Sequence, residues 1–253
     1  MYKILANTIF LGKDVHFLPE CHSTNDIALN LVRQNKATEG SIIICQHQTK
    51  GKGQRGNMWQ SQAGQNLTFS LVLRPDFMDI SEQFYLNMAI SNSIRRLLQD
   101  YVSHLEVKWP NDLIVPGFGK IGGILIENTF SGKEWEFAIV GIGLNINQLG
   151  FDSPNASSIR SITGSQFNLE ELFRLLITQL EQGYIQLKKG KWKEIKAEYL
   201  MHLYRIGSWA NYTANGEQFS GKIVGITVDG KLEMESRNGE IAIFGLKEIS
   251  FLQ

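Results

Sequence analysis

The sequence predicts an α+β protein, in which helices cover a mixed, mostly antiparallel sheet and a small all-β module follows. Three observations predict this architecture. Short apolar and β-branched runs recur between residues 41 and 142, as in sheet strands. Stretches with helical spacing of apolar residues lie among and after these runs. Beyond Gly207, Asn-Gly and Asp-Gly pairs separate short strands, which is typical of hairpin turns.

Length and composition limit the class of protein. A chain of 253 residues has room for one large domain and a small appended module. Lysine plus arginine and aspartate plus glutamate both total 25, which gives no global reason to expect a nucleic-acid or membrane partner. Cys21 and Cys45 lack the spacing of a disulfide framework or zinc site. With no signal-like or membrane-spanning apolar run, we expect a soluble, cytoplasmic protein.

The first predicted elements flank a glycine-rich loop. Residues 23–26 (Ser-Thr-Asn-Asp) offer capping side chains, so a helix is expected to start there. Its apolar face comprises Ile27, Ala28, Leu31 and Val32. Residues 41–45 and 67–73 are rich in β-branched and apolar residues and predict strands. The loop of residues 50–56 lies between these two strands.

The middle of the chain predicts another helix and more strands. Ser81 is expected to cap a helix whose apolar positions are Phe84, Met88, Ile94, Leu97, Leu98 and Tyr101. Residues 105–109, 124–127 and 135–142 are typical of sheet strands. We expect the helix to cover this sheet.

Two further helices precede the β module. Asn168 and Glu171 have the spacing of a capping box and open a helix that runs to Leu187. A second amphipathic stretch carries Trp192, Ile195, Tyr199 and Leu203. We place the domain boundary near Arg205, which gives residues 1–204 to the large domain and 205–253 to the β module.

The glycine-rich loop formally spells the dinucleotide-binding pattern G-x-G-x-x-G with Gly51, Gly53 and Gly56. A Rossmann site requires a helix directly after the glycines, whereas here a polar loop leads into another strand. A P-loop pattern is absent as well. Exposed backbone N–H groups together with Lys52 and Arg55 suit contact with phosphates. The alternative is a hairpin loop kept soluble by its charges.

Three further segments carry candidate polar groups. Asn111 and Asp112 follow a strand ended by Pro110 and suit Mg²⁺ with substrate phosphates, unless they form an ordinary turn. Lys120 stands at the entrance of a strand, where it would stabilise charge developing on a carboxylate and an α-phosphate, or is a solvated loop lysine. Residues 141–147 combine glycines with two asparagines, the alternative being an edge strand with a bulge.

In series, these segments closely resemble the biotin protein ligase family. The chain shows, in the family's order, Ser23-Thr24-Asn25, GKGQRGNMW (51–59), KWPND (108–112), GKIGGIL (119–125) and GIGLN (141–145). The resemblance spans essentially the whole chain. It implies a fold like that of class II aminoacyl-tRNA synthetases and biotin ligases, with an SH3-like β-barrel at the C-terminal end.

The resemblance also implies a reaction. Biotin and ATP, with Mg²⁺, would give biotinyl-5′-adenylate and pyrophosphate. A lysine of a biotin carboxyl carrier domain, part of a biotin-dependent carboxylase, would then attack the acyl carbon. Adenylation is required because a free carboxylate has no adequate leaving group.

Residue roles follow from the same resemblance. Lys120 and Arg55 match the catalytic residues. Residues matching the biotin site are Ser23, Thr24, Asn25, Gln48, Gly51, Lys52, Gly53, Gly123, Leu125, Gly141 and Gly143. Residues matching the nucleotide site are Gln54, Arg55, Trp59, Lys108, Asn111, Lys120 and Asn145. Asn111 and Asp112 would hold the metal ion.

Two departures from the family pattern matter. Gln54 stands where relatives often have arginine, so Lys52 or Arg55 must compensate, or the adenylate is retained less well. No helix-turn-helix segment precedes Ser23, so we expect a ligase that does not bind DNA. The alternatives are a lipoate protein ligase and a catalytically silent biotin or nucleotide sensor. Sheet edges also permit a homodimer.

Overall fold

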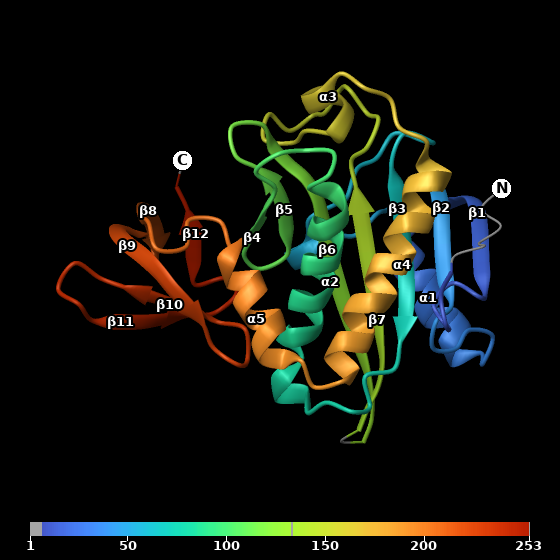
Figure 1. Ribbon diagram of the computed structural model, residues 1–253, viewed down its shortest axis with the longest axis horizontal. Coiled ribbons are helices and arrows are strands. Elements are labelled where there is room, and N and C mark those ends of the chain that lie inside the picture. The colour runs from blue at the N-terminus through green and yellow to red at the C-terminus, as the bar shows by residue number, and fades with distance from the viewer. Residues whose placement is uncertain (1–6, 133, 253) are drawn as a thin grey trace.

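A computed structural model describes residues 7–132 and 134–252, except for the side chains of Arg55 and Ser131. Within these residues, seven strands form one sheet in the order β1-β2-β3-β7-β6-β5-β4 (Figure 1). In that order the strands are β1 (Val15–Cys21), β2 (Ile42–Gln48), β3 (Leu67–Leu73), β7 (Glu134–Leu144), β6 (Gly119–Ser131), β5 (Asp112–Val115) and β4 (Glu106–Lys108). The β1–β2 pair is parallel and the others are antiparallel, so the predicted mixed, mostly antiparallel sheet is confirmed.

Helices cover both faces of this sheet. On one face, α1 (Thr24–Arg33) packs Ala28 and Val32 against Ile43, Val72 and Ile139 of the strands. Figure 1 shows two long helices crossing the opposite face, α2 and α4. The helices on that side are α2 (Phe84–Leu98), α4 (Leu169–Lys188) and α5 (Trp192–Met201). The short helical elements are η1 (Gln54–Gly56), η2 (Ile80–Glu82) and α3 (Ile159–Thr163).

The C-terminal strands form a second, antiparallel sheet in the order β11-β10-β9-β8-β12. These strands are β8 (Trp209–Ala214), β9 (Glu217–Ile226), β10 (Leu232–Glu235), β11 (Ile241–Phe244) and β12 (Ile249–Phe251). The predicted hairpin turns are confirmed, with positive φ at Gly216, Gly230 and Gly239. Among the described residues β11 and β12 do not pair, so the expected barrel is an open sheet. The boundary at residues 204/205 remains a prediction.

The structure corrects two local predictions about helix caps and excludes one alternative. Ser81 does not cap α2, because it lies in η2 and the helix begins at Phe84. Strand β7 pairs with β3 on one side and β6 on the other, so it is not an edge strand, and Asn145 follows its last residue. Ser23 occupies the N-cap position of α1 without a side-chain capping bond. The capping role of Asn168 is confirmed, since its Oδ1 accepts from two backbone N–H groups of α4.

None of the helices in the described part of the chain is long and apolar enough to cross a membrane.

Candidate active site

A narrow slot lies between the start of α1, the end of β2 and the facing surfaces of β6 and β7. The predicted residues that line it are Ser23, Thr24, Asn25, Gln48, Lys52, Gly53, Gln54, Trp59, Asn111, Lys120, Gly123, Leu125, Gly141 and Gly143. Thr68, Ile124 and Ile142 also line it and were not predicted. Gly51 lies behind the lining, where a Cβ would come within 2.4 Å of the Trp59 carbonyl oxygen.

Two glycines on neighbouring strands let other groups lie directly on the sheet. Gly123 and Gly143 are register partners on β6 and β7. A Cβ at Gly143 would lie 2.4 Å from the Trp59 ring, and one at Gly123 would lie 3.2 Å from Lys120 Nζ. The indole can lie there only because Gly143 lacks a side chain, and Gly123 gives the ammonium room beside the strand.

The free volume in the slot is about 40 Å³. A space of this size holds a few water molecules. Outside the strands, the lining is formed by the start of α1, by Asn111 and by four residues of the loop, Lys52, Gly53, Gln54 and Trp59.

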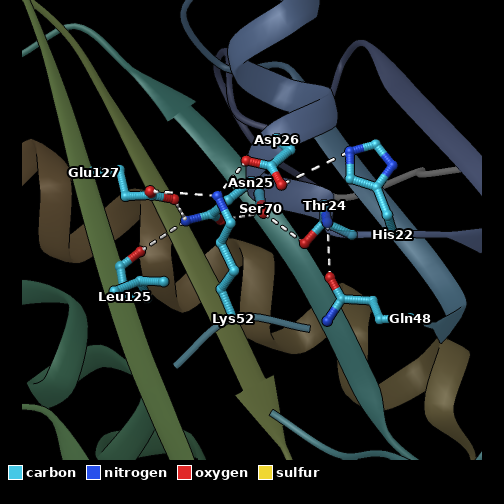
Figure 2. A network of polar contacts seen from close by, with 9 residues as sticks. All are labelled: His22, Thr24, Asn25, Asp26, Gln48, Lys52, Ser70, Leu125 and Glu127. Carbon is cyan, nitrogen blue, oxygen red and sulfur yellow. Dashed lines mark hydrogen bonds and ion pairs between the residues drawn. The ribbon is translucent and has the colours of Figure 1, made fainter. Parts of the chain in front are cut away.

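A polar network orients the side chains of the slot (Figure 2). The backbone N–H of Thr24 donates to Gln48 Oε1 at 2.7 Å, which leaves the Gln48 amide nitrogen as a donor for a ligand. Asn25 Oδ1 accepts from Ser70 Oγ at 2.6 Å, while its Nδ2 donates to Glu127 Oε2 at 2.7 Å. Both ends of the buried Asn25 amide are thus used within the protein, so Asn25 organises the wall of the slot.

A second, larger cavity of about 780 Å³ adjoins the slot. Trp59 and Lys120 line both spaces. The predicted residues that line the larger cavity are Trp59, Lys108, Asp112, Lys120 and Asn145. Phe118, Arg205 and Phe251 also line it and were not predicted.

Lys120 occupies the junction between the two spaces. Its Nζ lies 2.6 Å from Asp112 Oδ1 and 5.8 Å from the centre of the Trp59 ring. Its backbone is fixed by a hydrogen bond from its N–H to the Asn155 carbonyl at 2.7 Å. A cation held in this way can contact one group in the slot and a second group in the cavity.

Two buried polar atoms at this junction have no hydrogen-bond partner among the described residues, Asn145 Oδ1 and Trp59 Nε1. The other end of the Asn145 amide is satisfied, because Nδ2 donates to the Ser157 carbonyl at 3.0 Å. An unsatisfied buried polar group costs about 1–3 kcal/mol. Their position beside a cavity leaves both atoms available to a ligand.

The C-terminal sheet contributes to the cavity near Lys108. The ammonium of Lys108 lies 5.1 Å from the centre of the Phe251 ring. Burial, assisted by the positive charges of Arg205 and Lys120, lowers the pKa of Lys108 below its ordinary value, although Asp112 acts in the opposite direction. The cavity lining carries three cationic side chains, Lys108, Lys120 and Arg205, against Asp112 and Asp152, and a polyanion would gain from the partly desolvated positive charges.

The protein oxygens at this site would hold a metal ion only together with oxygens of a bound ligand. No cluster of three or more His, Cys, Asp or Glu residues that could hold a metal occurs among the described residues. Asp112 and Asp152 line the cavity, and Asn111 uses its Nδ2 on the Ile124 carbonyl at 2.5 Å, which leaves its oxygen available. Mg²⁺ is commonly held by one or two carboxylates plus substrate phosphates, and this donor set fits that pattern.

The predicted role of Arg55 falls on a side chain outside the described part of the structure.

Comparison with known proteins finds a matching family, similar sequences and a similar solved structure. The sequence model described as "Biotin/lipoate A/B protein ligase family" matches residues 18–145. The bifunctional ligase/repressor BirA of Bacillus spizizenii is 29% identical over 241 residues, covering 92% of this chain and 72% of that protein. A biotin–acetyl-CoA-carboxylase ligase of Paracoccus denitrificans is 29% identical, with 89% and 96% covered. The structure of a biotin protein ligase from Aquifex aeolicus in complex with biotin and ATP superposes with a TM-score of 0.77 at 26% identity, covering 95% of this chain and 99% of that one.

Proposed function

The chain belongs to the biotin/lipoate A/B protein ligase family, and from this membership and the geometry of its site we propose that it is an ATP-dependent biotin protein ligase. A relative named for biotin ligation, from Paracoccus denitrificans, matches along 89% of the chain. The similar Aquifex aeolicus enzyme is solved with biotin and ATP. The slot receives the biotin ring system, and the larger cavity receives ATP.

The reaction has two group-transfer steps. A carboxylate oxygen of biotin attacks the α-phosphorus of ATP, and the bond to the bridging oxygen breaks to release pyrophosphate. The neutral amine of an acceptor lysine then attacks the acyl carbon of biotinyl-5′-adenylate. The amide bond forms, AMP leaves with the electron pair of the broken C–O bond, and the nitrogen loses a proton.

The observation that carries the proposal is the position of Lys120. It lines both the slot and the cavity, so one ammonium can contact both the carboxylate in the slot and the α-phosphate in the cavity. Charge grows on the phosphate oxygens during the first step, and a fixed cation stabilises that charge most where water is excluded. Asn145 would offer its unpartnered Oδ1 to the nucleotide, and Lys108 would face the phosphates.

Three parts of the proposal concern the surroundings of the reaction. The acceptor is a carrier domain of a biotin-dependent carboxylase, in keeping with the name of the Paracoccus denitrificans relative. Asp112 and Asn111 would hold Mg²⁺, which neutralises phosphate charge when it is bound with ATP. We place the reaction in the cytoplasm.

The test is an acylation assay with a biotin carrier domain, ATP, Mg²⁺ and either biotin or lipoate. The expected result is transfer of biotin with release of pyrophosphate, and a loss of about 100-fold or more in Lys120→Ala, the size found when a transition-state charge contact is removed. Lys189→Ala, at the far end of α4, is the matched control and retains the full rate. Transfer of lipoate instead would change the substrate, and biotin binding without pyrophosphate release would refute the ligase.

A further inference from the structure

The loop over the slot forms a small hairpin that links Lys52 to Trp59. Lys52 and Met58 form an isolated antiparallel bridge. The Trp59 N–H donates to the Gly51 carbonyl at 2.9 Å, and the Gly53 N–H donates to the Asn57 carbonyl at 2.7 Å. If one side of the hairpin (residues 51–53) is displaced, these bonds therefore move the other side (residues 57–59) with it.

The side chain of Lys52 ties this hairpin to two separate elements of the fold. Its Nζ donates to Asp26 Oδ1 on α1 and lies 3.9 Å from Glu127 Oε1 on β6. Figure 2 shows the ammonium between these two carboxylates. One cation thus joins the loop to both walls of the slot.

Both carboxylates are held by neighbouring groups. Glu127 accepts from Asn25 Nδ2 at 2.7 Å through its other oxygen, and Asn25 is fixed in turn by Ser70. The second oxygen of Asp26 lies 3.7 Å from His22 Nε2. The ammonium therefore meets an arranged pair of anions, which reduces the conformational entropy that an exposed ion pair must lose on forming.

We propose that Lys52 is a positioning residue, which holds the loop of residues 51–59 closed over the slot through Asp26 and Glu127 and so keeps Trp59 against Gly143 beside Lys120. This role rests on the proposed function, because the consequence of closure is retention of biotin and its adenylate. It also revises the sequence-based hypothesis that Lys52 serves the phosphates. The hydrogen bond to Asp26 raises the pKa of Lys52, so the ammonium stays charged throughout the neutral range.

The place of the loop gives this contact its importance. Lys52, Gly53, Gln54 and Trp59 line the slot, so a ligand bound there leaves more readily when the loop moves outward. An ion pair that must break during opening slows the escape of a bound ligand, whereas it contributes little to the chemistry at Lys120. The signature of the role is a faster ligand dissociation with a nearly unchanged rate of adenylation at saturation.

The experiment compares Lys52→Met, Asp26→Asn and the double variant, with Lys52→Arg as the conservative change. Lys50→Met is the matched control, because Lys50 is an exposed lysine of the same loop that forms no ion pair with the described residues. Two quantities are measured, the hydrogen exchange of peptides covering residues 49–66 without ligand and the dissociation rate of biotin.

We expect Lys52→Met and Asp26→Asn each to speed both exchange and dissociation by about two- to fivefold, the size of an exposed ion pair. The double variant adds nothing further, Lys52→Arg restores the original rates, and Lys50→Met changes neither. If Lys52 instead contacts a phosphate, Asp26→Asn leaves both rates unchanged while Lys52→Met weakens ATP binding, and the proposal is overturned. Exchange needs no substrate, so failure of the wild-type chain to bind biotin would refute the function and leave the exchange result as the test of the loop.

Discussion

The slot and the larger cavity are adjacent but built differently. The slot is made of glycine backbone on two central strands and of side chains whose polar groups are mostly satisfied inside the protein. The cavity is lined by charged and aromatic side chains from loops, from the ends of strands β4, β5 and β6, and from the C-terminal strand β12. It retains an unpartnered oxygen on Asn145.

This difference indicates a division of labour. A slot of fixed shape discriminates by exclusion, because a rigid sheet does not yield to a misfitting ring system. A charged cavity binds by electrostatics and by filling vacant hydrogen bonds, so it tolerates small changes of shape. Changes of volume should therefore damage biotin binding selectively, and changes of polarity should damage nucleotide binding selectively.

The largest effect is expected from Gly143→Val. A Cβ there would lie 2.4 Å from the Trp59 ring, so the indole must leave the sheet. We expect biotin affinity to fall on the order of 100-fold, the upper range for overpacking a tight site, with the KM for ATP changed much less. Isothermal titration with biotin measures the loss.

Gly123→Ala on the partner strand is the graded control for this prediction. Its added methyl group meets the flexible end of Lys120 at 3.2 Å, which can move aside. Biotin affinity should therefore fall far less than in the Gly143 variant. If both variants lost biotin affinity equally and had equal melting temperatures, the slot would not discriminate through a rigid sheet.

The second effect tests the cavity through Asn145→Ala. This variant removes the unpartnered oxygen, and we expect the KM for ATP to rise about tenfold while biotin affinity stays within about twofold. Asn147→Ala is the matched control, because the Asn147 amide is equally buried but uses both ends on Phe167. If the Asn147 variant raises the KM for ATP as much, the oxygen of Asn145 has no special role.

The fold was predictable where a strand is buried on both faces. Strand β3 is buried along its whole length, and its apolar run predicts it directly. Strand β1 was missed because most of its residues are only half-buried and it includes Pro19, so neither alternation nor an apolar run marks it. Strand β5 was missed because it begins directly after the polar Asn111 and is short.

The same contrast applies to the site. The slot residues lie in short contiguous motifs, so the sequence identified most of them, apart from apolar neighbours such as Ile124 and Ile142. The cavity residues Phe118, Arg205 and Phe251 come from three distant segments, and only the tertiary arrangement brings them together. The glycine-rich motif of residues 51–59 also contains Trp59, but no local sequence pattern could show that the Trp59 ring lies over Gly143.

A smaller effect concerns Gln54, which lines the slot beside Lys52. Since the Lys52 ammonium is paired with Asp26, it cannot also supply the charge that Gln54 lacks. We expect Gln54→Arg to slow release of biotinyl-adenylate into solution about fivefold, through a new charge-assisted contact. Gln54→Met is the uncharged control. Release at an unchanged or faster rate, followed by chromatography of the free adenylate, would contradict this prediction.

The smallest effect is a pH dependence that arises from Lys108 and weakens ATP binding while it stabilises the fold. Because burial lowers the pKa of Lys108 below 10.5, this residue loses its proton at a lower pH in the folded protein than in the unfolded chain. In the pH window between these two pKa values the unfolded state binds more protons, so the free energy of unfolding should rise with pH. The cavity simultaneously loses a cation, so the KM for ATP should rise about two- to threefold over the same window, as for a partly exposed charge contact. In Lys108→Arg the charge persists and both trends should disappear. A KM for ATP that rises equally in the wild type and in this variant would assign the titration to another group.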